Sequence, residues 1–176
     1  EAKQVIADKV AGLLKDDMLV LMEGGTTNME IAKKIPEGLR ATFFTVSPQV
    51  AMALAEHEEI EVITIGGRLA KNANIHTGAS LINELSNLKV DLCIIGTNGI
   101  SVKDGLTDSD WEVVQVIKAI LRTGKKTAVV TIAEKLNTTQ KIRIADLNSI
   151  DYIITELPAE SPVLSSYRGA DRPIVL

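Results

Sequence analysis

The stretch Leu19-Val-Leu-Met-Glu-Gly-Gly-Thr-Thr-Asn28 joins an apolar segment to two glycines, two hydroxyl side chains and the start of a helical pattern. The apolar segment predicts a buried strand, and the polar segment predicts a turn into a helix. Backbone N–H groups at the start of a helix lack intrahelical partners, and the helix dipole favours negative charge there. The stretch is therefore either a phosphate-binding loop or an ordinary strand–helix turn capped by threonine, and the loop alone favours neither.

Strand and helix patterns alternate along the rest of the chain, and residues 1–15 show the apolar spacing of an amphipathic helix. The expected strands are Leu19–Met22, Thr42–Thr45, Glu61–Ile65, Val90–Ile95, Thr127–Thr131, Tyr152–Thr155 and Ile174–Leu176. The expected helices are Thr27–Lys34, Pro48–His57, Ser80–Leu88 and Ser109–Arg122, with shorter candidates at Gln140–Ala145 and Ser161–Tyr167. Several strands are apolar on both faces, which is typical of a parallel sheet covered by helices. The sequence predicts a three-layer α/β fold, with a mostly parallel sheet and helices on both faces.

Glycines and polar residues follow the expected strands. Ligands of such sheets bind at the carboxyl ends of the strands, so these loops predict a binding site. The loops are Gly24–Asn28, Ser47–Gln49, Gly66–Arg68, Gly96–Gly99 and Ala133–Lys135. The segment Arg68–Ala79 has no clear pattern, and we expect it to form a flap over the site.

Charged residues in these loops suit a phosphorylated ligand. Arg68 and Lys135 could each pair with a dianionic phosphate, or each could be a solvated surface side chain. Asp104–Glu112 holds four carboxylates before a helix, with Asp108 or Ser109 as the expected N-cap. Asp110 and Glu112 could serve the helix alone, or could also accept hydrogen bonds from the hydroxyl groups of a ligand.

Composition limits the classes of function. The chain has 176 residues, 45% of them hydrophobic and 24% charged, which is typical of one soluble globular domain. The net charge is −4 and no basic run occurs, so this segment is not expected to bind DNA by itself. No apolar run is long enough to span a membrane.

Neither a metal nor a cofactor is expected. The chain has two histidines and one cysteine, without the spacing of a metal site, and it lacks complete nucleotide-binding glycine motifs. The single Cys93 excludes an internal disulfide, fits a reducing cytoplasm, and is expected to be buried in a strand. The helical pattern begins at Glu1, so we expect the chain to be part of a longer polypeptide.

Across nearly its whole length the chain resembles the C-terminal effector-sensing domain of DeoR-type bacterial transcriptional repressors. The landmarks, in order, are Gln4–Leu14, Gly24–Asn28, Thr45-x-Ser47, Gly66–Arg68, Gly78, Ile94–Ile100, Gly105–Thr107, Glu112, Lys135 and Asp151–Thr155. Each landmark is common by itself, whereas their order and spacing together are specific.

The resemblance implies a fold like that of ribose-5-phosphate isomerase and a phosphorylated sugar or related metabolite as effector. Residues 1–176 would then form one sensor domain, with DNA bound only through a winged helix-turn-helix domain that precedes it. A homo-oligomer is expected, since a repressor on a two-fold operator is usually symmetric. By position, Gly25, Thr26, Thr27 and Asn28 would hold the phosphate. Thr45, Ser47, Gly96, Thr97, Asn98, Gly99, Glu112 and Lys135 would line the rest of the pocket.

The sequence departs from the family pattern at two places. Thr45-Val-Ser47 stands where the family typically has Thr-Asn-Ser, and Ile132-Ala-Glu-Lys135 stands where it typically has Asp-Ser-Ser-Lys. The identity of the effector therefore stays open. The alternative to a sensor is a sugar-phosphate isomerase-like enzyme on the same fold, with an acid of the Asp104–Glu112 segment as general base. We expect the sensor, and hence no catalytic residue.

Overall fold

Among residues 1–169 and 173–176, which the computed structural model describes, seven strands form the main sheet in the order β12-β11-β9-β6-β1-β2-β3. These strands are β1 (Leu19–Met22), β2 (Ala41–Thr45), β3 (Ile60–Thr64), β6 (Val90–Gly96), β9 (Gly124–Val130), β11 (Tyr152–Ile154) and β12 (Ile174–Val175). Every neighbouring pair in this sheet is parallel. The predicted parallel α/β fold is confirmed.

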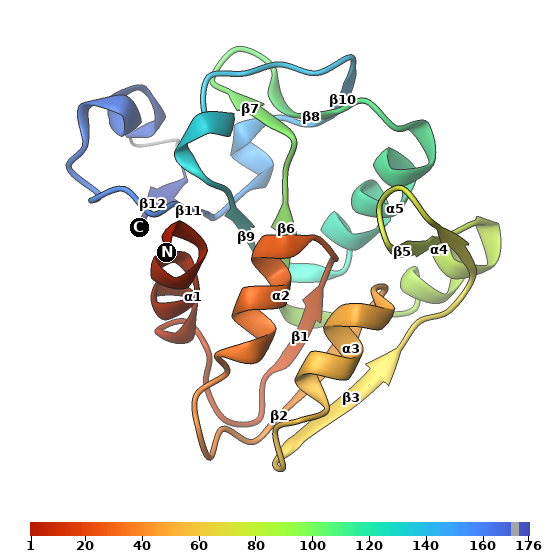
Figure 1. Ribbon diagram of the computed structural model, residues 1–176. Coiled ribbons are helices and arrows are strands. Elements are labelled where there is room, and N and C mark those ends of the chain that lie inside the picture. Colours follow the sequence, from red (N-terminus) through yellow and green to blue (C-terminus); the bar gives the residue numbers. More distant parts are fainter. Residues whose placement is uncertain (170–172) are drawn as a thin grey trace.

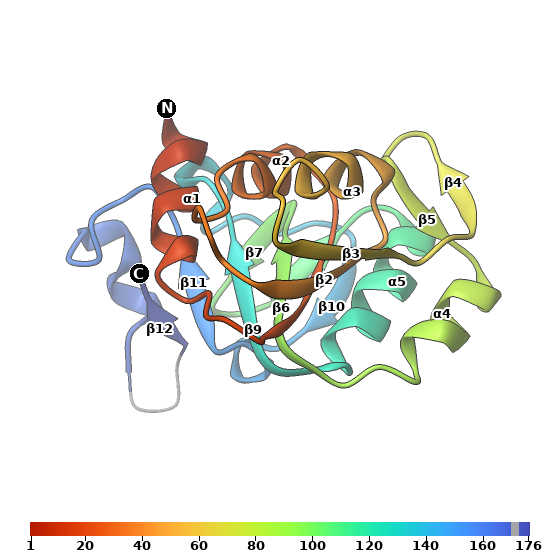
Figure 2. The same ribbon diagram turned by 90° about the horizontal axis from the view of Figure 1, so that it is seen from below.

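Helices cover both faces of the sheet (Figure 2). One face carries α1 (Ala2–Ala11), α2 (Thr26–Lys33) and α3 (Pro48–Leu54), and the other carries α4 (Ala79–Leu85) and α5 (Trp111–Leu121). Strand β1 shows why both faces are buried: Val20 and Met22 pack with the first group of helices, whereas Leu21 packs with the second. The three predicted layers follow from these apolar residues on both sides of each central strand.

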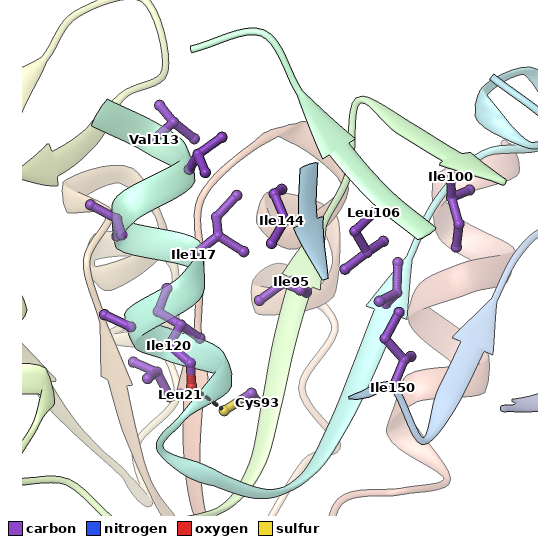
Figure 3. Packing of buried hydrophobic residues seen from close by; sticks show 14 of the residues in the cluster. Leu21, Cys93, Ile95, Ile100, Leu106, Val113, Ile117, Ile120, Ile144 and Ile150 are labelled. Atoms are coloured by element: carbon purple, nitrogen blue, oxygen red, sulfur yellow. Dashed lines mark hydrogen bonds between the residues drawn. The ribbon is translucent and has the colours of Figure 1, made fainter. Parts of the chain in front are cut away.

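Cys93 lies fully buried in β6, as the sequence predicts. Its sulfur is 3.2 Å from the carbonyl oxygen of Ile120 and packs beneath α5 (Figure 3). Burial raises the pKa of the thiol to about 11, which suits a core residue and not a nucleophile.

A small antiparallel sheet lies beyond the carboxyl end of β6 (Figure 1). It consists of β7 (Gly99–Ser101), β8 (Gly105–Asp108) and β10 (Ile142–Ala145), in the order β10-β8-β7. The short helix predicted at Gln140–Ala145 is therefore wrong. The two isoleucines of β10 lie on either side of Arg143, and Ile144 points toward Ile117 of α5 and Leu106 of β8 (Figure 3).

The segment expected to be a flap is a hairpin of β4 (Arg68–Ala70) and β5 (Ile75–Thr77). Asn74 closes its turn with a positive φ of 54°, a conformation that asparagine tolerates better than most residues. Short 3-10 helices complete the chain: η1 (Ala133–Lys135), η2 (Leu147–Ser149) and η3 (Pro162–Tyr167). No helix among the described residues is long and apolar enough to cross a membrane.

Candidate functional site

A cavity of about 500 Å³ opens at the carboxyl ends of β1, β6 and β9. The β1–α2 loop, the tip of the β4–β5 hairpin, the β6–β7 loop, the β8–α5 junction and η1 all line it. In Figure 1 these segments gather around the upper end of the main sheet. The cavity therefore lies where a parallel α/β sheet is expected to bind a ligand.

The β1–α2 loop presents the start of a helix to this cavity. Gly25 is the N-cap of α2, with a φ of 95°, and no side chain caps the helix. The alternative of a threonine-capped turn is therefore wrong, because Thr26 and Thr27 are already the first residues of α2. A side chain on Gly24 would place its Cβ 2.5 Å from Ile75. Both glycines are thus needed for a loop whose helical N–H groups stay free of a capping side chain.

A lysine from another helix reaches this loop. Lys3 of α1 lines the cavity, and its Nζ donates a hydrogen bond to Oγ1 of Thr26 over 2.7 Å. Asn28 supports the loop from below, since its buried Nδ2 donates to the carbonyl oxygen of Gly24 over 2.9 Å. The loop therefore combines a helix N-terminus, hydroxyl groups and a cation, which together favour an anion.

Glu23 is a buried carboxyl group in the same cavity and directly precedes Gly24. Its side chain is only 8% exposed, and its Oε1 accepts a hydrogen bond from the backbone N–H of Gly96 over 2.9 Å. Burial is the largest cause that raises the pKa of Glu23 to about 8, and the nearby Asp108 acts in the same direction. The Gly96 hydrogen bond and Lys135 act in the opposite direction but do not offset the burial.

Asp108 and Asn98 form a hydrogen-bonded network on the side of the cavity next to Glu23. Oδ2 of Asp108 accepts from Nδ2 of Asn98 over 2.9 Å, and its Oδ1 accepts from the backbone N–H groups of Ser109 and Asp110. Nζ of Lys135 lies 3.4 Å from Oδ1 of Asn98. Carboxylate, amide and ammonium groups thus meet at one place, where they can bind the hydroxyl groups of a ligand.

Asp110 connects the hairpin tip to α5. Its Oδ1 caps the helix by accepting from the backbone N–H of Val113, and its Oδ2 accepts from Nδ2 of Asn72 over 2.6 Å. The hydrogen bond from Asn72, followed by that from Val113, lowers the pKa of Asp110. The expected N-cap, Asp108 or Ser109, is therefore wrong by one or two residues, because Asp108 caps the preceding turn instead.

The structure brings most of the sequence-predicted site residues together. Those that line the cavity are Gly24, Gly25, Thr26, Thr27, Gly96, Thr97, Asn98, Asp110 and Lys135. Asn28, Thr45, Ser47, Arg68, Gly99 and Glu112 do not line it.

The residues outside the cavity have structural contacts of their own. Thr45 accepts from the backbone N–H of Ser47, and Ser47 caps α3. The backbone of Gly99 pairs with the Thr97 hydroxyl. Arg68 is exposed in β4, and Glu112 is exposed in the first turn of α5.

Sequence reasoning assigned no role to Glu23 or Lys3 and placed Asn72 only within the expected flap, and all three residues line the cavity. Glu23 could have been found from its position at the end of β1, since side chains at strand ends face such sites. Lys3 gave no comparable signal, because α1 reaches the site only through tertiary packing. Among the described residues, no group of histidine, cysteine or acidic side chains could hold a metal ion.

Residues 1–157 of the chain match the family model of the DeoR C terminal sensor domain. The chain belongs to this family. The DeoR-type domain is 30% identical to the HTH-type transcriptional regulator GlpR of Haloferax volcanii over 156 residues, which cover 89% of this chain and 61% of GlpR. It is 32% identical to the HTH-type transcriptional repressor GlcR of Bacillus subtilis over 156 residues, which cover 89% of this chain and 60% of GlcR. The chain thus spans about three fifths of the length of these relatives.

The fold of the DeoR-type domain is also found in an enzyme. Ribose 5-phosphate isomerase A from Methanocaldococcus jannaschii has a TM-score of 0.55 at 18% identity, and the match covers 76% of this chain and 53% of the isomerase. At this identity the likeness shows the fold alone, and it confirms the predicted isomerase-like fold. The family and the relatives are those of transcriptional regulators, so the domain is a sensor and not an isomerase.

Proposed function

We propose that the cavity binds a phosphorylated sugar or a related polyol phosphate, and that its occupancy controls DNA binding by a preceding winged helix-turn-helix domain. The observation that carries this proposal is the N-terminus of α2, which faces the cavity without a capping side chain and has Lys3 beside it. A phosphate placed there would accept hydrogen bonds from the helix N–H groups and the Thr26 and Thr27 hydroxyls. Its charge would be compensated by the helix dipole and by an ammonium group.

The rest of the cavity suits hydroxyl groups better than a second anion. Asp108, Asp110 and Glu134 are acceptors for O–H donors, while Asn98 can both donate and accept. Lys135 is a cation in this part of the cavity, and its Nζ lies 3.4 Å from Oδ1 of Asn98. A ligand with one phosphate and several hydroxyl groups therefore fits both parts of the cavity, and this supports a sugar monophosphate.

The names of the relatives support the regulatory part of the proposal. GlpR and GlcR are both named as HTH-type transcriptional proteins, and this chain corresponds to about three fifths of each. The remaining two fifths leave room for a DNA-binding domain. The net charge of the present chain, −4, fits a sensor that contacts DNA only through such a domain. We also propose that the sensor is a homo-oligomer, as is usual for regulators of this symmetric kind.

Thermal unfolding against a panel of ligands tests the phosphate site. The panel contains ribose 5-phosphate, glucose 6-phosphate, fructose 1-phosphate and glycerol 3-phosphate, each beside its unphosphorylated parent. A ligand at a hundred times its Kd adds about 2.7 kcal/mol of stability, which for a domain of this size is a shift on the order of 5–10 °C. We expect a shift with a phosphorylated compound and none with its parent.

Two variants and a control make this experiment specific. Thr27→Ala removes a hydroxyl group from the loop, and Lys135→Ala removes a cation from the cavity, so both should reduce the shift. Lys125→Ala removes a cation whose side chain is 77% exposed on β9, away from the cavity, and should leave the shift unchanged. Equal shifts with phosphorylated and unphosphorylated sugars would contradict a phosphate site.

A further inference from the structure

Glu23 has a carboxyl oxygen without a protein partner at the floor of the cavity. Oε1 accepts the hydrogen bond from Gly96, and no other hydrogen bond to the carboxyl group occurs among the described residues. The side chain is 8% exposed and lines the cavity. The second oxygen is not among the buried unpartnered atoms of the described residues, so it is open to the cavity, where solvent or a ligand can form a hydrogen bond with it.

The groups around Glu23 act on the protonation of its carboxyl group. Asp108 of β8 is 4% exposed and accepts hydrogen bonds from three N–H donors, whereas Glu23 accepts one. The charge of Lys135 in η1 lowers the pKa of Glu23. The other charged groups that line the cavity are Lys3, Asp110 and Glu134. Burial with a single hydrogen-bond donor, beside the charge of Asp108, thus favours the protonated form of Glu23.

We propose that protonated Glu23 donates a hydrogen bond from its free carboxyl oxygen to the phosphorylated effector, so that effector binding requires a proton on Glu23. The inference rests on the proposed function and adds a specific contact to it. Glu23 directly precedes the Gly24–Thr27 loop, so an ionised carboxylate there would repel the phosphate. A protonated carboxyl group is neutral and can donate a hydrogen bond to an oxygen of the same phosphate.

This contact gives the affinity a defined dependence on pH. Burial raises the pKa of Glu23 to about 8, so below this pH the free protein already carries the proton. Above it, each binding event must take up one proton from solvent, and the affinity falls by up to tenfold per pH unit. The second pKa of a phosphate monoester is about 6, so the ligand itself does not titrate between pH 7.5 and 9.5.

Isothermal titration calorimetry at pH 7.5, 8.5 and 9.5 tests the proposal. The probe is the member of the four-phosphate panel that gives the largest thermal shift. For a pKa of about 8, the affinity of the unmodified protein should fall about 25-fold from pH 7.5 to 9.5. At pH 8.5, titrations in buffers of different ionisation enthalpy should show uptake of about 0.8 proton per ligand bound.

Variants separate the hydrogen bond from a structural effect. Glu23→Gln is neutral at every pH and keeps a donor, so its affinity should not depend on pH and its proton uptake should be near zero. Glu23→Ala lacks the donor and should bind more weakly than Glu23→Gln at pH 7.5. Glu84→Gln changes an exposed acid on α4 and should retain the full pH dependence. Thermal unfolding of each variant shows that it is folded at each pH.

Each outcome decides between the two proposals. Binding of a sugar phosphate with the same pH dependence in Glu23→Gln as in the unmodified protein would overturn the role of Glu23, while leaving the phosphate site intact. A uniform loss of affinity in Glu23→Gln with an unchanged pH dependence would show a purely structural side chain and would overturn the role as well. Absence of binding by every phosphate in the panel would overturn both.

Discussion

Nδ2 of Asn72 lies 2.6 Å from Oδ2 of Asp110, and this hydrogen bond joins the tip of the β4–β5 hairpin to the first turn of α5. The two residues are far apart in sequence, and both line the cavity. Asp110 also caps α5 through Val113. One carboxylate therefore accepts hydrogen bonds from both a helix terminus and the hairpin tip that lines the candidate site.

Loss of the Asn72 hydrogen bond should loosen the hairpin tip without unfolding the domain. In Asn72→Ala we expect faster amide hydrogen exchange at residues 71–74, because the tip loses its contact with α5. Exchange in the core strand β6 should stay unchanged. The substitution Asn83→Ala, at an exposed position on α4, is the matched control. Unchanged exchange at the tip would show that the turn itself, and not the contact with Asp110, orders the hairpin.

Trp111 provides an optical signal for the same contact. It is the single tryptophan, it directly follows Asp110, and its side chain is 65% exposed. Binding of a ligand beneath the hairpin should therefore change the intensity or wavelength of its emission. The change should be smaller in Asn72→Ala, in which the hairpin is no longer held against α5.

Removing the cap of α5 should cost measurable stability. Asp110→Ala deletes the acceptor for the backbone N–H of Val113, and loss of an N-cap typically costs about 1 kcal/mol. Asp110→Asn keeps a good capping side chain and should cost less. Urea denaturation monitored by circular dichroism gives both values, and Ser109→Ala, at the exposed neighbouring position, should change little. Equal losses in the two Asp110 variants would assign the effect to charge and not to capping.

Gly25 should be sensitive to substitution even though space is available. No heavy atom lies within 4 Å of a Cβ built on it, but its φ of 95° is strained for any other residue. Strain of this kind costs on the order of 1–3 kcal/mol, so Gly25→Ala should lower the free energy of unfolding by about that amount. If Gly25→Ala were as stable as the unmodified protein, the loop would have relaxed and its ligand affinity should then fall.

Glu23 should make the domain less stable as the pH rises. Its pKa is raised from 4.5 to about 8 by burial, so the folded state binds the proton more tightly than the unfolded state. Between these two values the unfolded state binds fewer protons, and stability therefore falls as pH rises. The total loss is on the order of 5 kcal/mol at 1.36 kcal/mol per pKa unit.

Denaturation at pH 5, 7 and 9 measures this effect. The free energy of unfolding of the unmodified protein should fall across the series more steeply than that of Glu23→Gln. Above pH 8 the variant should be the more stable of the two. Parallel pH profiles for the two proteins would mean that Glu23 is hydrated in the folded state and ionises normally.

The main sheet could be predicted from the sequence because each central strand carries its own signal. Leu19–Met22 and Val90–Gly96 are apolar on both faces, and glycines follow both. The small sheet could not be predicted from the sequence, because its three strands are short and their pairing is non-local. Ile142 pairs with Asp108 across a helix and a long strand, and the Gln140–Ala145 pattern alone is compatible with one turn of helix.

The candidate site, like the fold, could be predicted from the sequence only in part. Loops at strand ends could be located, because the topology of a parallel sheet brings them together. The direction in which each side chain points could not be predicted from the sequence. Thr45 ends β2 and Ser47 follows it, yet their hydroxyl groups accept hydrogen bonds from backbone N–H groups at the start of α3. The burial of Glu23, which raises its pKa, depends on tertiary packing and not on the local sequence.

The hydrogen bond from Lys3 to Thr26 has a consequence for signalling. Lys3 belongs to α1, so a rotation or a shift of that helix changes the positive charge at the N-terminus of α2. A ligand whose affinity depends on this charge then favours one position of α1 over another. Thermodynamic linkage makes the coupling reciprocal: whatever fixes α1 from outside the domain alters the affinity for the ligand by the same factor. The binding of an anion in the cavity and the position of the first helix would thus be coupled through one ammonium group.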